Sequence, residues 1–414
     1  MRRSSSCVVF DVEWAGGPLP GEWVEGPWPA RLPDGSAADR DRRLTYFEPR
    51  VSASLFGARG RPARWHLHRP PDADADTDAD QPAVRAVELL RVPAAAGLDD
   101  RRRGLAVLHV RLGGDPLGEL PTLARLPADR ARLAGILPDA VRVADSTRRA
   151  WTLTHVTFAR GRPPAVMPAE YATWTTTDQW LWLLASATPL DRFAPDPEDA
   201  GLFAGRVRFS ADWQALVLRD GAAFVGTSPD PGGEAPFHAS AARHVHTVYL
   251  DVFLLGRLQY LGANALANAA SELGARDWDA NRLRRLEGRL IEQRRALWSS
   301  HITSRGKADE LLTRFQEQLR LDQLASHTAT GLADTARFVE EARSRRTSVA
   351  LSLLSAVGLP FGLAYAGAAL WGQPGPRNLL LATGVAVLLT IALFAAVPSL
   401  RGLLSDTMWD RAED

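Results

Sequence analysis

The chain has 414 residues, of which 49 are Lys or Arg and 48 are Asp or Glu, so its formal net charge is +1. A chain so close to neutrality has no overall field to attract nucleic acid, and we expect no nucleic-acid partner. Its single cysteine, Cys7, excludes an intrachain disulfide and any cysteine-based zinc cluster, as is typical of a reducing compartment.

Residues 1–244 predict a mixed α/β domain. Four runs rich in β-branched or aromatic residues are typical of strands, and shorter helices are expected near 128–137 and 177–187. The strand-like runs are 7–14, 84–92, 105–112 and 150–158. The clearest local signal is Asp220-Gly221 between the apolar runs 206–219 and 222–227, which predicts a tight hairpin turn.

The pattern becomes helical over residues 245–347. Segments 245–270 and 281–298 predict helices, the second amphipathic, and 299–306 predicts a break. No proline occurs between Lys307 and Pro360, so we expect one long stalk helix there. Residues 321–342 carry an apolar stripe with alternating steps of four and three, which favours self-association of that helix into a homo-oligomer.

The C-terminal region contains two segments without any Asp, Glu, Lys, Arg or His, at 348–371 and 378–397. Each is roughly 30 Å long as a helix, enough to cross a bilayer. A transmembrane hairpin over 348–397 is therefore expected, followed by a tail at 398–414. Arginines flank the hairpin at its two ends, so the positive-inside rule predicts both termini in the cytoplasm, with the hairpin in a bacterial inner membrane.

This order of elements resembles the CorA-type magnesium transporter superfamily. The resemblance rests on Leu359-Pro360 within the first apolar segment and on the polar run 340–347 before it. It implies an α/β cytoplasmic domain, a long α-helical stalk, two C-terminal transmembrane helices, and a pentamer embedded in the lipid bilayer. A divalent cation such as Mg²⁺ would be the cargo of a protein of this kind.

The chain departs from that family at its signature, Gly-Met-Asn. Its three methionines are Met1, Met167 and Met408, so the signature is absent. The equivalent positions, Ala369, Leu370 and Trp371, carry no side-chain oxygen for hydrated Mg²⁺. The family's ion filter is therefore not transferred to this chain.

One face of the first apolar segment carries small or hydroxyl side chains. The residues Ser348, Ser352, Ser355 and Gly362 share a helical face and are predicted to line a pore; they equally suit close helix packing in lipid. The expected function is an ion channel or transporter of altered selectivity, gated by the cytoplasmic domain. The alternative is a membrane-anchored effector or scaffold without transport, whose cytoplasmic domain binds a partner or signal.

Catalytic motifs are missing from the sequence. It contains no P-loop, nucleophile elbow, dinucleotide fingerprint or His-Glu-x-x-His, so we expect no enzyme. Two i, i+2 histidine pairs, His66 with His68 and His244 with His246, would share a zinc ion if their segments met. Such pairs are also common as ordinary strand or loop residues, and Asp251 at the head of a helix is expected to be structural.

Overall fold

The computed structural model describes most of the chain in two compact units, Met1–Leu332 and Ala333–Asp414. Each unit is considered by itself. The described residues are 3–15, 18–30, 43–58, 60–69, 81–92, 103–158, 163–228, 237–272, 280–299, 301–304, 306–370 and 376–396.

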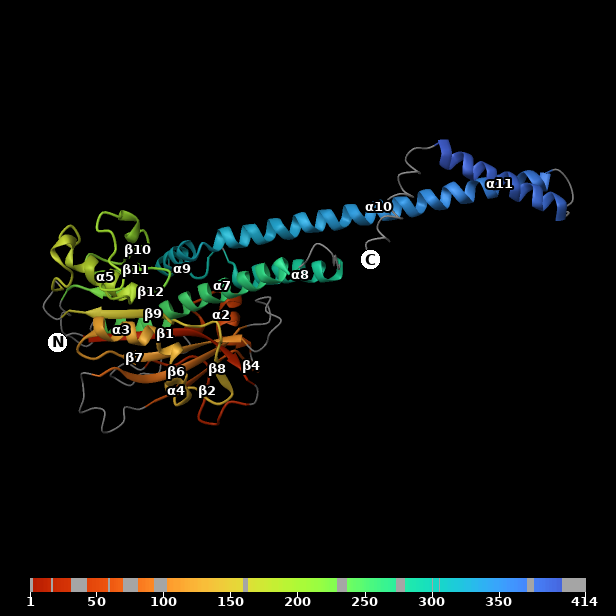
Figure 1. Ribbon diagram of the computed structural model, residues 1–414. Helices are drawn as coiled ribbons and strands as arrows, with labels where there is room; N and C mark the ends of the chain where they lie inside the picture. The colour runs from red at the N-terminus through yellow and green to blue at the C-terminus, as the bar shows by residue number, and fades with distance from the viewer. Residues whose placement is uncertain are drawn as a thin grey trace. The chain divides into compact units, whose positions relative to one another are not determined.

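The first unit is built on a mixed sheet of ten strands (Figure 1). Its order is β10-β11-β12-β9-β1-β7-β6-β5-β2, with β8 paired to one end of β1. Among the described strands, only β9 and β12 pair in parallel, and the connection between them contains α5. The strands of the sheet are β1 (Arg3–Trp14), β2 (Val24–Glu25), β5 (Arg64–His68), β6 (Ala83–Arg91), β7 (Arg103–Arg111), β8 (Val141–Val143), β9 (Trp151–Thr157), β10 (Arg206–Arg208), β11 (Trp213–Val217) and β12 (Gly221–Gly226); β3 (Gly57–Ala58) and β4 (Arg61–Pro62) form a separate pair.

Helices cover both faces of this sheet and make two hydrophobic cores. One core packs α2 (Pro49–Phe56), α7 (Leu250–Ser271), α8 (Ala280–Leu297) and α9 (Gly306–Leu319) on one face. The other core packs α3 (Pro116–Ala124), α4 (Arg130–Ala134) and α5 (Thr176–Ser186) on the opposite face. Because the central strands are covered on both sides, their sequences are nearly continuous apolar runs. The remaining short elements are η3 (Leu126–Ala128), η4 (Ala169–Tyr171), η5 (Ala200–Phe203), α6 (Phe237–His244) and the π-helical turn η6 (Val245–Tyr249).

Most strands and helices expected in the first unit are confirmed. The four strand-like runs correspond to β1, β6, β7 and β9, and the helix expected at 281–298 corresponds to α8. The single strand expected over 206–219 is wrong, because the chain reverses within it and forms β10 and β11. The backbone N–H groups of Phe209 and Ser210 both donate to the carbonyl of Trp213, closing that turn.

The single stalk helix expected from Lys307 is also wrong. Helix α9 ends at Leu319, and α10 (Leu321–Leu370) begins after one intervening residue. That residue, Arg320, has a φ of 52°, in the left-handed region. A left-handed residue cannot continue an α-helix, so the chain changes direction there without any proline.

Replacing Arg320 with glycine is expected to raise the free energy of unfolding by about 0.5–1 kcal/mol. The left-handed conformation costs a non-glycine residue about 1–2 kcal/mol, and the extra freedom of glycine in the unfolded chain removes roughly 0.5–1 kcal/mol of that gain. Urea unfolding measures the change. As a control, Arg314→Gly lies inside α9 and should lower stability by about 1 kcal/mol; equal effects at both positions would contradict the explanation.

In the second unit, the described residues belong to α10 and to α11 (Pro376–Ala396). The prediction of two membrane spans at 348–371 and 378–397 is wrong. Within the described ranges, no helix combines the length and the apolar character that crossing a bilayer requires.

Three further expectations depended on those spans and are corrected with them. The fold class is a ten-stranded mixed sheet covered by helices, without the two transmembrane helices of a CorA-like protein. A location in the inner membrane with two spans and both termini in the cytoplasm is wrong for the same reason. The description of the chain as a transmembrane protein is wrong for the same reason, whereas its expected transport function stays a prediction.

Candidate metal centre

A line of polar side chains interrupts the apolar face of the sheet that packs against α7. Successive residues of a strand point to opposite faces, so Ser5 and Cys7 of β1 share a face with the core residue Val9. Cys7 lies directly opposite His109 of β7 in the antiparallel register. Glu88 of the next strand, β6, shares this face with Leu90.

The π-helical turn η6 brings a third donor to this pair. It carries His246 over the sheet, immediately before α7. The His246 Nδ1 lies 3.1 Å from Cys7 Sγ and 3.0 Å from His109 Nδ1, and Cys7 Sγ lies 3.5 Å from His109 Nδ1. Turns of this kind are rare and occur often at functional sites.

These three atoms form a triangle of the size that a tetrahedral metal ion requires. Bond lengths of about 2.0 Å from zinc to nitrogen and about 2.3 Å to sulfur place two ligand atoms roughly 3.3–3.6 Å apart. The observed separations of 3.0–3.5 Å are close to this range. In the part of the chain that the structure describes, Cys7, His109 and His246 are the group of His, Cys, Asp or Glu residues able to hold an ion in this way.

The outer nitrogen of each imidazole is also held. His109 Nε2 donates to Glu88 Oε1 at 2.7 Å, and His246 Nε2 is hydrogen-bonded to Ser5 Oγ at 2.8 Å. The indole of Trp28, half-buried, lies with its ring centroid 4.4 Å from that of His109. A metal-bound histidine usually has its second nitrogen bonded to a carboxylate or another oxygen, which fixes the ring orientation.

Behind His109 lies a buried cluster of two carboxylates and two guanidinium groups. Arg43 bonds Asp251 through Nε at 2.5 Å and Nη2 at 2.7 Å, and Arg64 Nη1 donates to Asp251 at 2.6 Å. Arg64 Nε donates to Glu88 Oε2, so Arg64 joins both carboxylates. All four side chains are at most 2% exposed, and their formal charges cancel. Asp251 thus balances two buried guanidinium groups, as a structural role would require.

The local environment sets the protonation of each group. Burial lowers the pKa of His109, although its bond to Glu88 opposes this, and burial together with His109 and His155 lowers the pKa of His246 well below its ordinary value. Burial, then Glu88, raises the pKa of the Cys7 thiol. Without a metal, the centre therefore holds two neutral imidazoles and a protonated thiol at neutral pH.

With His109 Nε2 donating to a carboxylate, a neutral His109 has its lone pair on Nδ1, the atom that faces Cys7 and His246. The tautomer that the Glu88 bond selects is thus the one that metal coordination requires.

Only one of the four histidines considered from the sequence as weak candidates for metal binding belongs to this centre. His246 does; His66, on β5, bonds through Nδ1 to the Gly26 carbonyl at 2.9 Å. His68 is exposed at the end of β5, and His244 ends α6 beside Tyr249. A single cysteine excludes a cysteine-based zinc cluster but leaves room for a mixed set, because two histidines lie beside Cys7.

The two candidate ligands that were not anticipated, Cys7 and His109, have only a weak signal in the sequence. Each is a donor residue inside a strongly apolar strand, on its core-facing side. A histidine or cysteine in such a place needs a partner, but the sequence does not say that the two strands pair at these positions.

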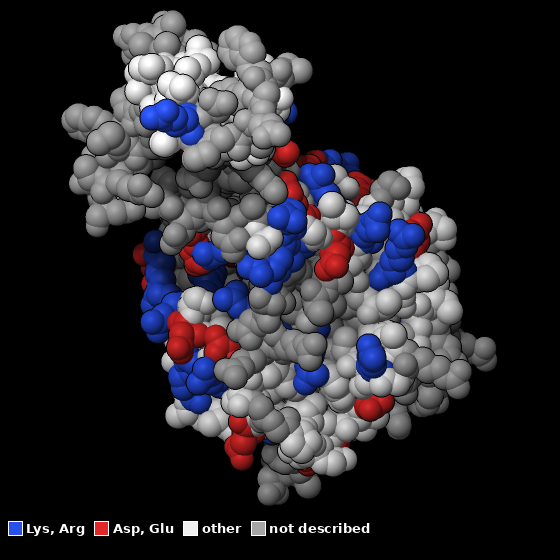
Figure 2. Space-filling model, turned by 90° about the vertical axis from the view of Figure 1, so that its right-hand side faces the viewer, with Lys and Arg blue, Asp and Glu red and all other residues white. Residues whose placement is uncertain are grey.

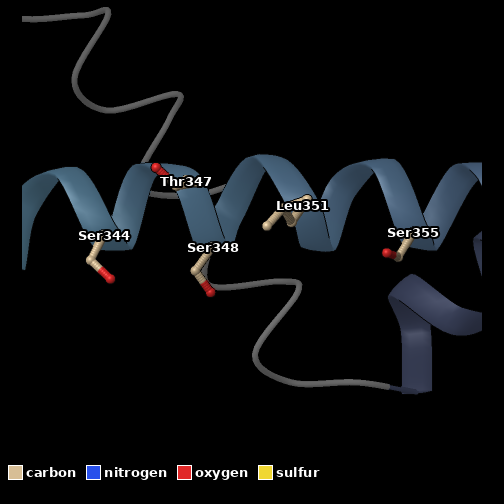
Figure 3. A pocket seen from close by; sticks show the side chains of 5 residues that line it. All are labelled: Ser344, Thr347, Ser348, Leu351 and Ser355. Atoms are coloured by element: carbon tan, nitrogen blue, oxygen red, sulfur yellow. The ribbon is translucent and has the colours of Figure 1, made fainter.

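The residues predicted to line a pore lie on α10 in the second unit. Ser348, Ser355 and Gly362 are exposed there, while the side chain of Ser352 lies outside the described residues. Figure 3 shows Ser348 and Ser355 projecting from the same side of the helix, with Ser344. At the positions equivalent to the family filter, Ala369 is exposed, Leu370 ends α10, and Trp371 falls outside the described ranges.

Charged side chains of both signs are interspersed on the face that Figure 2 presents, as the formal charge of +1 suggests.

Comparisons of the chain with protein-family models, curated proteins and solved structures find no match. The resemblance to CorA-type transporters therefore stays a prediction, and function is argued from the site alone.

Proposed function

We propose that the first unit is a metal-binding module whose centre consists of Cys7, His109 and His246. The observation that supports this most directly is the mutual approach of three donor atoms within 3.0–3.5 Å, on three elements far apart in sequence. Each imidazole also has its outer nitrogen held by an oxygen atom.

The donor atoms favour Zn²⁺ or a similar thiophilic cation. One thiolate and two imidazoles match the borderline-soft character of zinc, whereas Mg²⁺ prefers oxygen ligands. Three protein donors leave one tetrahedral vertex, which in zinc proteins takes water or another exogenous ligand.

In this proposal the chain is a metal-binding protein, and the signal that it senses is the presence or absence of metal at the centre. This keeps the part of the effector or scaffold alternative that concerns signal binding, and it includes no catalytic step. The ion-channel hypothesis requires two membrane spans, and no described helix provides one. Self-association through α10 stays a prediction.

Titration with Co²⁺ tests the proposal, because Co²⁺ replaces Zn²⁺ and reports its ligands spectroscopically. Metal-free wild-type protein should bind one equivalent, with visible bands of a tetrahedral ion and a near-ultraviolet thiolate charge-transfer band. Cys7→Ser should lose the charge-transfer band, and His246→Ala should weaken binding by at least tenfold, the lower end of the effect of removing even a supporting residue.

His68→Ala serves as the matched control, since His68 is exposed on β5 and lies outside the centre. It should bind Co²⁺ with the wild-type spectrum. Folded wild-type protein that binds no Co²⁺, or a charge-transfer band that survives Cys7→Ser, would contradict the proposal.

A further inference from the structure

A cavity in the first unit lies away from the metal centre, between α7, α8 and the first two turns of α10. Its volume is about 350 Å³, within the usual range for small-molecule sites. Apolar side chains line most of it, including Ala263 and Leu266 from α7, Leu290 and Trp298 from or just after α8, and Ala325 from α10. In Figure 1 α7 and α8 run side by side, and the two helices are in contact.

The cavity contains a buried hydrogen-bond donor without a partner. Gln293 of α8 lines it and is 1% exposed, yet its Nε2 has no hydrogen-bond partner among the described residues. Gln259 on the adjacent helix α7 is equally buried, but both its amide nitrogen and its amide oxygen have a hydrogen-bond partner. Its Nε2 donates to the Leu297 carbonyl at 2.8 Å, and its Oε1 accepts from Gln316 at 2.9 Å.

This contrast is informative because an unsatisfied buried amide is costly and rare. A donor left unpaired inside an apolar cavity can be satisfied by an acceptor atom that enters with a ligand. The only described charged side chains on the lining are Arg294 and Asp322, both exposed, so the deeper part of the cavity carries no net charge.

We propose that this cavity binds a small, predominantly apolar molecule carrying one carbonyl-type oxygen. The apolar body lies among Leu266, Leu290 and Trp298, and the oxygen accepts from Gln293 Nε2. Since Ala325 belongs to α10, the bound molecule contacts the start of that helix. The proposal is independent of the metal centre and names a second ligand for the first unit.

The test compares two probes that differ only at the proposed acceptor. 2-Acetylnaphthalene carries a carbonyl oxygen, and 2-isopropenylnaphthalene replaces that oxygen with a methylene group of similar shape. Binding to full-length protein is measured by ligand-observed saturation-transfer NMR. Both probes should bind, and 2-acetylnaphthalene should bind about tenfold more tightly, the effect of one hydrogen bond to a buried donor.

Two variants locate the binding site. Gln293→Leu removes the donor and should reduce the preference for 2-acetylnaphthalene to about twofold or less, without lowering the melting temperature of the ligand-free protein. Ala325→Phe fills the cavity and should abolish binding of both probes. Circular dichroism confirms that each variant is folded.

Absence of saturation transfer from either probe in folded wild-type protein would overturn the proposal. So would binding that both variants leave unchanged, because the probes would then occupy another surface. Equal affinity of the two probes in the wild type would also overturn it, since Gln293 would then play no part in recognition.

Discussion

Glu88→Gln is expected to lower the free energy of unfolding of the metal-free protein by about 3–5 kcal/mol, the usual cost of removing one partner from a buried ion pair. Glutamine keeps the shape of the side chain but removes its charge. Arg64 then remains fully buried with only Asp251 to balance it and the nearby Arg43. The hydrogen bond from His109 Nε2 also loses its charged acceptor. Urea unfolding after removal of metal with EDTA measures the change.

Glu13→Gln is the matched control, because Glu13 lies on the same strand as Cys7 but at the surface. It pairs with Arg142 at 2.9 Å, with side-chain exposures of 29% and 65%. An exposed pair of this kind contributes about 1 kcal/mol or less. If Glu88→Gln cost no more than Glu13→Gln, the buried cluster would not be a determinant of stability.

The same residue predicts how stability changes with pH. Burial alone would raise the pKa of Glu88, but Arg64, Arg43 and the bond from His109 outweigh it and hold the pKa well below its ordinary value. A carboxylate with a lowered folded pKa contributes stability that is complete above the unfolded pKa of about 4.3 and is lost as pH falls toward the folded value. Wild-type protein should therefore lose stability below about pH 4, and the slope should be shallower in Glu88→Gln.

The strands of the first unit could be predicted because their signal is local. Runs such as 105–112 are rich in β-branched and apolar residues, and the Asp220-Gly221 turn is recorded in two adjacent residues. The stalk was predicted as one helix because the break depends on Arg320 taking a left-handed conformation. No proline or glycine stands at that position to indicate a helix end in the sequence. The membrane spans were inferred from the length of two apolar segments and their lack of charge, and the described part of the chain holds no helix that meets the requirements for crossing a bilayer.

The metal centre could not be predicted because it depends on long-range pairing. Cys7 and His109 are neighbours only through the register of β1 against β7, and His246 reaches them only through the π-helical turn η6. Histidines at i, i+2 drew attention because they are close in sequence. The residues that meet are instead separated by 102, 137 and 239 positions. Spacing rules find metal sites on one hairpin or helix, and this one is assembled from three elements.

Zinc binding is expected to release about one proton per ion near neutral pH, and the proton should come from Cys7. A thiol must be deprotonated to bind a metal, whereas neutral imidazoles bind without losing a proton. Burial raises the pKa of Cys7 and lowers those of His109 and His246, so only the sulfur carries a proton that zinc must displace. The apparent affinity should therefore rise about tenfold for each pH unit, until the pH reaches the pKa of the thiol.

Isothermal titration calorimetry in buffers of different ionisation enthalpy counts this proton directly. Cys7→Ser should bind zinc more weakly and release none, because a serine hydroxyl stays protonated, while His68→Ala should release about one. Zinc at a thousand times its dissociation constant should also raise the free energy of unfolding of the wild type by about 4 kcal/mol, a gain that Cys7→Ser loses at the same zinc concentration. No proton released by the wild type would exclude Cys7 as a ligand. A second proton would come either from an imidazole that was charged before binding, against the effect of its burial, or from water bound at the fourth zinc vertex.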